Sequence, residues 1–323
     1  MMRYRCAILD DYQNVALKLA DWSKVSNDVD VKVFNEHMTT DEEVVRALRD
    51  FQIICVMRER TPFTRAMIEK LPNLRVMCTT GPGNASIDAK ALHDRNITFC
   101  HTGSTGDPTA DLAFGLILEL VRRVGWENAR IKAGASPWQT RLGINLEGKT
   151  LGIIGLGRLG SHVASIAKAF RMRVIAWSQN LTPEKCAAAG VEYATKEELF
   201  RQSDIITIHM RLSPRSTGLV GVPDLALMKP TAYIVNTSRG PLIDEAALVE
   251  ALRAGKIAGA GLDAFDVEPL PMDHPFRKLE NAVVTPHLGY VTEDVYRIFF
   301  RDTVDNIRGF IDGKPVRVIR PTA

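Results

Sequence analysis

The fold is decided by residues 151–160, which read LGIIGLGRLG. The apolar first half is typical of a buried strand, and a helix-like stretch follows at 161–170. Between them the glycines are spaced Gly-x-Gly-x-x-Gly. In such a unit the first glycine makes the tight turn, the second lets the backbone approach a pyrophosphate, and the third lets the helix pack on the strand. An ordinary turn between strand and helix is the weaker interpretation in this context.

This loop predicts a dinucleotide-binding unit, because the free N–H groups at a helix N-terminus bind phosphate. The predicted loop contacts are Gly155, Gly157, Arg158, Leu159 and Gly160.

Short β-rich runs alternate with helix-like stretches on both sides of the loop, as is typical of parallel α/β sheets. The first series of runs is 5–9, 31–34, 53–57, 75–79 and 97–101, and the second is 151–155, 173–177, 204–209, 232–236, 258–263 and 282–286. We therefore expect an α/β protein with two doubly wound parallel sheets, one flavodoxin-like and one of the Rossmann type.

Two long helical stretches organise the chain around these sheets. The stretch 107–133 is expected to lead from the first series to the second. The stretch 292–311 is apolar on one face, and we expect it to return to the first domain. The predicted domains are therefore 1–101 with 293–323, which would bind substrate, and 102–292, which would bind the dinucleotide.

Composition excludes several classes of protein. The 323 residues are 46% hydrophobic and 24% charged, which is typical of a globular protein with a sizeable core. The net charge is only +3 and the basic residues are scattered, so we expect neither nucleic acid nor a membrane as partner. No signal peptide, transmembrane run or metal-ligand spacing is evident, and the five cysteines fit a reducing compartment. A cytoplasmic protein without a metal is the expectation.

The strand after the glycine loop ends in Ser178, Gln179 and Asn180. An Asp or Glu usually stands there to bind the adenosine ribose hydroxyls of NAD. Its absence removes a charge that would repel a ribose phosphate, which favours NADP, yet no Arg at these positions would bind that phosphate. Ser178 and Gln179 are predicted cofactor contacts, and NAD remains an alternative.

Three later segments place reactive side chains directly after strands, where open α/β sheets collect their ligands. They read NTSRGPLID at 236–244, DAFDVEP at 263–269 and TPHLG at 285–289. Together with the glycine loop, these motifs in this order resemble those of the D-2-hydroxyacid dehydrogenase family over essentially the whole chain.

The resemblance implies hydride transfer between NAD or NADP and a 2-oxo or 2-hydroxy acid, with three catalytic residues. His287 would be the proton donor for the developing alkoxide, and Glu268 would hold the other ring nitrogen. Arg239 would bind the substrate carboxylate through its planar fork of donors. Taken singly, these residues could instead be a turn histidine, a turn cap and a surface ion-pair partner.

The resemblance also implies further contacts with the cofactor and the substrate. Cofactor contacts are Asp263, Thr237, His209 and Thr109, and substrate contacts are Gly81 and Gly83. Apart from the resemblance, Arg58 and Arg60 follow the third predicted strand and would add positive charge for a second acidic group of the substrate, although a solvated charged turn is the simpler explanation of each. Pro82 lacks the N–H group that a substrate-binding loop would use, so the donor is missing there or moved to Gly83. Trp138 resembles a family residue that reaches a partner subunit, so we expect a homodimer.

The sequence thus favours a reductase of glyoxylate or hydroxypyruvate. A short phosphoglycerate dehydrogenase and a non-enzymatic, corepressor-like dinucleotide sensor are the alternatives. Glu268 argues against the formate dehydrogenase branch of the family, because the family pattern implies that members of this branch have Gln at this position.

Overall fold

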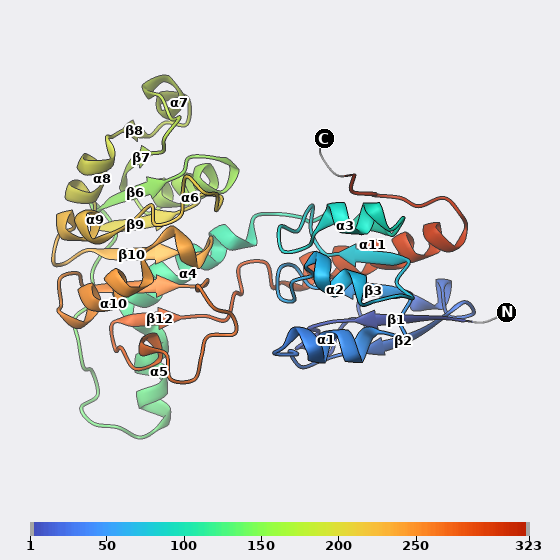
Figure 1. The fold of residues 1–323 in the computed structure, drawn as a ribbon. Coiled ribbons are helices and arrows are strands. Elements are labelled where there is room, and N and C mark those ends of the chain that lie inside the picture. The colour runs from blue at the N-terminus through green and yellow to red at the C-terminus, as the bar shows by residue number, and fades with distance from the viewer. Residues whose placement is uncertain (1–2, 321–323) are drawn as a thin grey trace. The chain divides into compact units, whose positions relative to one another are not determined.

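The computed structural model describes residues 3–320. The chain divides into two compact units, Met1–Gly106 with Thr292–Ala323 (unit 1) and Asp107–Val291 (unit 2). The sequence placed these divisions at 101/102 and 292/293. Each unit is an α/β structure in which every strand pairs in parallel, so the predicted fold class is confirmed (Figure 1).

Unit 1 contains a parallel sheet in the order β2-β1-β3-β4-β5. Its strands are β1 Tyr4–Ile8, β2 Val29–Val33, β3 Ile53–Val56, β4 Val76–Thr79 and β5 Thr98–His101. Its helices are η1 Trp22–Lys24, α1 Asp41–Leu48, α2 Arg65–Glu69, α3 Ala89–Asp94 and α11 Glu293–Ile311.

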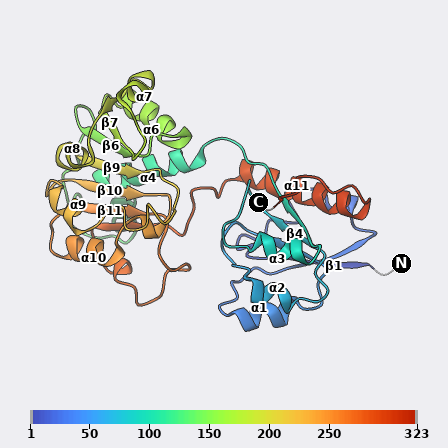
Figure 2. The same cartoon turned by 45° about the horizontal axis from the view of Figure 1, so that its top comes forward.

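Helices cover both faces of this sheet, with α1, α2 and α3 on one face and α11 on the other (Figure 2). The strands are therefore buried on both sides, which explains their continuous apolar runs. Four cysteines lie on neighbouring strands, and Cys55, Cys78 and Cys100 are in register across β3, β4 and β5. The Sγ atoms of Cys6 and Cys55 are 3.8 Å apart.

Unit 2 contains a sheet in the order β12-β11-β10-β9-β6-β7-β8. Its strands are β6 Thr150–Ile154, β7 Arg173–Trp177, β8 Glu192–Tyr193, β9 Ile205–Ile208, β10 Tyr233–Asn236, β11 Gly259–Leu262 and β12 Ala282–Val284. Its helices are α4 Pro108–Arg122, α5 Val124–Lys132, α6 Arg158–Ala169, α7 Pro183–Ala188, α8 Lys196–Gln202, α9 Val222–Leu227, η2 Gly240–Leu242, α10 Glu245–Arg253 and η3 Pro275–Arg277.

The sheet of unit 2 separates two hydrophobic cores. Leu151 and Ile153 of β6 pack with α4 and α6 on one face, while Ile154 packs with α8, α9 and α10 residues on the other. The chain runs from β6 outward through β7 and β8, then returns to β9 on the other side of β6 and runs outward again. The carboxyl ends of β6 and β9 therefore form a topological switch point, the usual ligand site of such sheets.

Two local expectations were wrong. The stretch 107–133 is not one helix, because Arg123 takes a left-handed conformation (φ 51°) that ends α4 and starts α5. The helix after the glycine loop begins at Arg158 rather than at Ser161, so Gly160 lies inside it. Within residues 3–320, no helix combines the length and apolar character needed to cross a membrane.

Candidate active site

The glycine loop after β6 needs its glycines for steric reasons. Gly155 has φ +98°, and a Cβ there would lie 2.6 Å from the carbonyl oxygen of His209. A Cβ on Gly160 would collide with the carbonyl oxygen of Gly155. Gly157 is exposed, and its missing Cβ faces open space. The first and third glycines thus allow tight packing, while the second leaves the backbone open to a ligand.

Two enclosed polar atoms on neighbouring strand ends also fit a bound dinucleotide. Among the described residues, Nδ1 of His209 and Oγ1 of Thr237 are buried and have no hydrogen-bond partner. Buried polar atoms normally have partners, so unpaired ones at a ligand edge point to a bound group. The other ring nitrogen of His209 lies 3.0 Å from Oγ1 of Thr207, and burial lowers the pKa of His209 to about 4.

The start of α6 is tied to the start of α4. Arg158 forms an ion pair with Asp107, and Nδ1 of His162 lies 3.3 Å from the same carboxylate. Leu159 is partly buried in the first turn of α6. Near the start of α4, the Thr109 hydroxyl donates a hydrogen bond to the carbonyl oxygen of Gly289, 2.8 Å away. Thr109 therefore links α4 to the segment that carries His287.

Ser178 and Gln179 follow β7, and Ser178 is partly buried while Gln179 is exposed. The Gln179 amide donates to the carbonyl oxygen of Arg215, at 3.2 Å. This bond ties the end of β7 to the loop that follows β9.

His287 and Glu268 meet, although 18 residues stand between them in the sequence. Nδ1 of His287 lies 2.7 Å from Oε2 of Glu268. An ionised carboxylate only accepts, so Nδ1 carries the hydrogen in this pair. The other oxygen of Glu268 accepts the N–H of Phe265 at 2.9 Å. Burial alone would raise the pKa of Glu268, but the contact with His287, the Phe265 N–H and the charge of Arg239 together lower it.

Arg239 is placed by a turn at the end of β10. The buried Asn236 side chain accepts the N–H of Ser238 and donates to the carbonyl oxygen of Arg239. Next to it, Gly240 lies so close to the backbone of Phe265 and Asp266 that a Cβ would collide with both. Glycine at 240 therefore lets the Arg239 turn approach the loop that carries Glu268. Unit 2 thus brings His287 and Glu268 into contact and places the Arg239 turn beside the loop that carries Glu268, where the positive charge of Arg239 helps to lower the pKa of Glu268.

Asp263 organises the turn that carries His287. Its buried carboxylate accepts the Thr285 hydroxyl at 2.6 Å and the N–H groups of Leu288 and Gly289 at 2.6 and 2.8 Å. Burial raises the pKa of Asp263, while these bonds oppose that shift. His287 itself has φ 54°, a left-handed conformation that costs energy in a non-glycine residue. The bonds to Asp263 hold that turn in place.

Sequence reasoning did not find Glu245 and His274, which hold the other catalytic loop. The N–H of Phe276 donates to Nδ1 of His274, so Nε2 carries the hydrogen and donates to Glu245 at 3.0 Å. The second oxygen of Glu245 accepts the N–H of Asp266 at 3.3 Å. Both residues are polar and stand near the motifs in the sequence. Their pairing could not be predicted, because it depends on α10 packing next to the loop that carries Glu268.

The predicted substrate loop of unit 1 is held by Arg58. Its guanidinium donates to the carbonyl oxygens of Thr80 (3.2 Å) and Gly83 (3.4 Å). The Gly81 N–H donates to the hydroxyl of Thr102 at 2.7 Å. Among the described residues, no acceptor contacts the N–H of Gly83. Gly83 is thus the loop glycine whose N–H is not used within the described chain.

Arg60 lies after β3 and contacts the segment after β1. Its guanidinium donates to the carbonyl oxygen of Asp10 at 2.6 Å and lies 4.3 Å from the ring centre of Tyr12. Asp10 is buried and accepts the Thr61 hydroxyl at 2.6 Å. Arg60 therefore helps to hold a buried polar cluster at the carboxyl edge of this sheet.

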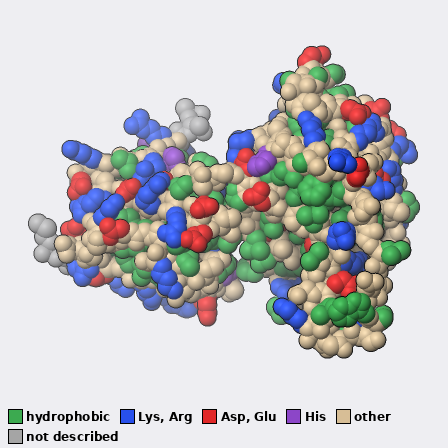
Figure 3. Space-filling model, turned by 180° about the vertical axis from the view of Figure 1, so that it is seen from behind, with side chains coloured by type: hydrophobic (Ala, Val, Ile, Leu, Met, Phe, Trp, Pro, Cys, Tyr) green, Lys and Arg blue, Asp and Glu red, His purple; other side chains and the backbone are tan. Residues whose placement is uncertain are grey.

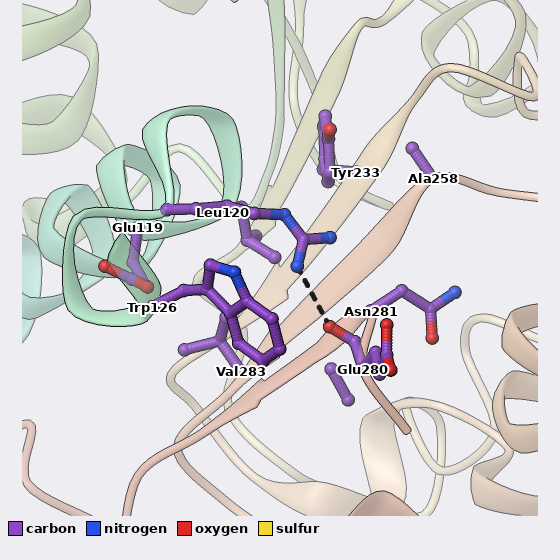
Figure 4. A pocket seen from close by; sticks show the side chains of 10 residues that line it. Glu119, Leu120, Trp126, Tyr233, Ala258, Glu280, Asn281 and Val283 are labelled. Atoms are coloured by element: carbon purple, nitrogen blue, oxygen red, sulfur yellow. Dashed lines mark hydrogen bonds between the residues drawn. The ribbon is translucent and has the colours of Figure 1, made fainter. Parts of the chain in front are cut away.

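A pocket of about 210 Å³ lies elsewhere in unit 2, at the amino ends of β10, β11 and β12. Trp126, Tyr233 and Glu280 are among its lining residues, and the dashed bond in Figure 4 joins Arg123 to the carbonyl oxygen of Glu280. It is at the opposite edge of the sheet from the catalytic trio, and the residues of the candidate active site do not line it. Among residues 3–320, no group of His, Cys, Asp and Glu is arranged to hold a metal ion.

Comparisons with known proteins show the family of this chain. Residues 114–289 match the profile "D-isomer specific 2-hydroxyacid dehydrogenase, NAD binding domain". A D-3-phosphoglycerate dehydrogenase of Methanocaldococcus jannaschii is 38% identical over 85% of this chain, but the chain spans only about half of that relative (52%). A hydroxypyruvate reductase of Blautia hydrogenotrophica is 33% identical over 93% of this chain and 94% of its own length.

The solved structure of a phosphoglycerate oxidoreductase from Vibrio cholerae O395 is similar to the whole fold. It superposes with a TM-score of 0.90 at 32% identity, covering 96% of this chain and 99% of the other. The chain therefore belongs to the D-isomer specific 2-hydroxyacid dehydrogenases. Unit 2 contains the NAD-binding domain of this family, because the matched residues all lie within it.

Proposed function

We propose that the protein reduces a small 2-oxo acid to a 2-hydroxy acid with a nicotinamide dinucleotide as hydride donor. The observation that carries the proposal is the His287–Glu268 hydrogen bond, beside the charge of Arg239, at the carboxyl ends of the unit 2 strands. Reduction of a ketone needs a proton donor and a cation near the developing alkoxide, and this trio supplies both.

The roles of the three residues follow from their bonds. Glu268 holds Nδ1–H of His287, which leaves Nε2 as the atom that delivers a proton to the substrate oxygen. The carboxylate also stabilises the imidazolium that exists before the proton is transferred. Arg239 binds the substrate carboxylate through paired N–H donors and orients the carbonyl beside it. The bound dinucleotide supplies the hydride.

The dinucleotide would lie along the carboxyl edge of β6, β7 and β9. Gly155, Gly157, Gly160, Arg158 and Leu159 would surround its pyrophosphate, as the open face at Gly157 supports. His209 and Thr237 would give their unpaired atoms to it, with Asp263 and Thr109 nearby. We favour NADP over NAD because no carboxylate follows β7 at Ser178 and Gln179.

The substrate is proposed to be glyoxylate or hydroxypyruvate. Gly83 would offer its N–H to the substrate carboxylate, in place of the donor that Pro82 lacks. Arg58 and Arg60, expected to bind a second acidic group, donate to loop carbonyl oxygens instead. Their use in holding loops supports a substrate without a phosphate, so phosphoglycerate is the second candidate.

The test is an absorbance assay of the purified protein with NADPH or NADH and a panel of glyoxylate, hydroxypyruvate, pyruvate and phenylpyruvate. We expect oxidation of the cofactor with glyoxylate or hydroxypyruvate. Dinucleotide binding without turnover of any 2-oxo acid would instead favour the corepressor-like sensor.

A homodimer formed through unit 2 is part of this proposal. Figure 3 shows hydrophobic side chains gathered at the end of unit 2 where α5 lies. Large apolar residues are exposed on α5 and the segment after it, namely Val124, Trp126, Ile131, Trp138 and Leu142. Apolar groups exposed together commonly mark an interface. Light scattering should give twice the chain mass, and Trp138→Ser with Leu142→Ser should shift it toward the monomer.

A further inference from the structure

The end of β7 has no positively charged side chain that could bind a phosphate on the adenosine ribose. Removal of a carboxylate permits a phosphate on the adenosine ribose, but selective binding also requires a cation. The three residues after β7 are Ser178, Gln179 and Asn180, which have none. If NADP is preferred, the cation must come from another segment that reaches this strand end.

The loop after β9 reaches the carboxyl end of β7. His209 donates its N–H to the carbonyl oxygen of Ile154 at 2.8 Å, so the loop starts beside the end of β6. Farther along, the carbonyl oxygen of Arg215 accepts the side-chain amide of Gln179 at 3.2 Å. The loop thus passes from the end of β9 to the end of β7, across the strand end that carries the glycine loop.

This loop has internal hydrogen bonds that fix its shape. The buried hydroxyl of Ser216 accepts the N–H of Ser213 at 2.8 Å and donates to the carbonyl oxygen of Arg211, also at 2.8 Å. Arg215 directly precedes Ser216, so its backbone is held from both sides, by Ser216 and by Gln179. Its position beside β7 is therefore built into the loop and does not depend on its own side chain.

The Arg215 guanidinium is available for a ligand. Arg215 is exposed, and the part of the chain that the structure describes gives its side chain no ion pair or hydrogen bond. Arg211 is likewise exposed, but its carbonyl oxygen is bound to Ser216 and not to a residue of the β7 end. Of the two arginines, Arg215 is the one attached to the predicted ribose position.

We propose that Arg215 binds the phosphate monoester on the adenosine ribose of NADP, together with the Ser178 hydroxyl and the Gln179 amide. The ligand class is an adenosine 2′-phosphate. A guanidinium binds a phosphate through paired charge-assisted hydrogen bonds, which supplies the selectivity that Ser178 and Gln179 lack. This inference rests on the proposed dinucleotide function and adds the residue that selects between its two forms.

The test is equilibrium binding by titration calorimetry, with adenosine 2′,5′-bisphosphate and adenosine 5′-monophosphate as probes. The variants are Arg215→Gln, Arg215→Lys and, as a matched control, Arg253→Gln. Arg253 is an exposed cation on α10 that pairs with Glu250, so its replacement removes the same charge away from β7. Thermal melting without ligand checks that every variant is folded, which we expect because Gln179 contacts only the backbone of Arg215.

We expect the wild type to bind the bisphosphate more tightly than the monophosphate. Arg215→Gln should weaken bisphosphate binding by roughly 10- to 100-fold, the usual value of charge-assisted bonds, and leave the monophosphate unchanged. Arg215→Lys should lose less, because the charge remains but the paired geometry is lost. Arg253→Gln should bind both probes like the wild type.

Several outcomes would overturn the proposal. One is equal binding of the two probes by the wild type, another is an unchanged ratio in Arg215→Gln, and a third is an equal loss for both probes. Since no turnover is measured, the result is independent of the reductase proposal. A protein that reduces no 2-oxo acid but shows this Arg215-dependent ratio would refute the enzyme and retain the phosphate site.

Discussion

At the scale of single residues, hydrogen bonds determine which atoms of Glu268 and His287 carry a hydrogen. Glu268 accepts from His287 and from the Phe265 N–H, so its carboxyl is held ionised and its pKa is lowered. Nδ1 of His287 is committed to this bond. The only ring nitrogen left to exchange a proton with substrate is Nε2, which gives His287 one chemical role.

His287→Ala removes the proposed proton donor. We expect turnover to fall by roughly 10²- to 10⁴-fold, the usual contribution of a positioned general acid, with dinucleotide binding retained. Steady-state kinetics and a binding titration measure the two effects separately. Turnover within a few-fold of the wild type would remove His287 from this role.

Arg239→Lys keeps the charge and removes the planar fork. The apparent KM for the 2-oxo acid should rise by roughly 10-fold or more, because bidentate binding of the carboxylate is lost. The comparison is the KM of both proteins for glyoxylate at saturating cofactor. An unchanged KM would mean that another group binds the carboxylate.

His209 makes stability depend on pH. Its folded pKa of about 4 lies below the unfolded value near 6.5, so below pH 6.5 the unfolded chain takes up a proton that the folded chain does not. Its contribution is present above pH 6.5 and is lost as pH falls to about 4, by roughly 3 kcal/mol in all. Urea unfolding between pH 4.5 and 7.5 should show a shallower slope for His209→Asn. Equal slopes would contradict this assignment.

At the scale of elements, the two loops that carry Glu268 and His287 are each held by a buried or partly buried carboxylate. Asp263 binds the 285–289 turn through three hydrogen bonds, and Glu245 connects His274 to the N–H of Asp266. Neither carboxylate is part of the trio, so their proposed task is to place it. Rigid support of this kind determines how well a site is preorganised.

Glu245→Gln should loosen the Glu268 loop without removing a reacting group. The amide cannot accept from both His274 and Asp266 as a carboxylate does, so kcat should fall by roughly 10-fold. A purely structural role would lower only the melting temperature. We therefore compare kcat, KM and melting temperature with those of Glu250→Gln, an exposed glutamate on the same helix. A normal kcat in Glu245→Gln would leave this residue without a positioning role.

Much of this arrangement could be predicted from the sequence. The strands are evident because burial on both faces gives unbroken apolar runs, as in 151–154. The edge strand β8 was missed, since its two exposed residues, Glu192 and Tyr193, carry no such run. The break at Arg123 has no local signal, because any residue can be forced into a left-handed conformation by tertiary contacts. The Gln179–Arg215 bond was missed because it joins two loops 36 residues apart, and only the tertiary fold brings them together.

At the scale of the whole molecule, each unit has its own core and its own parallel sheet. The candidate active site residues of unit 2 sit on strand ends fixed by two cores, one per face of its sheet. Unit 1 is closed on its second face by α11, which is distant in sequence from the rest of the unit. Its integrity therefore requires the C-terminal helix to remain docked.

The four cysteines of the unit 1 sheet are not part of the core that α1, α2 and α3 cover, so they make the docking of α11 measurable. Hydrogen bonds between neighbouring thiols and burial raise the pKa of Cys55 and of Cys100, so neither is a thiolate at neutral pH. All five cysteines are free and buried. An aromatic disulfide reagent should therefore label the native protein slowly and react fast once α11 is deleted or low urea detaches it. The labelling rate of these thiols thus reports how often the N-terminal sheet opens. Fast labelling of the intact protein would show that α11 does not protect them.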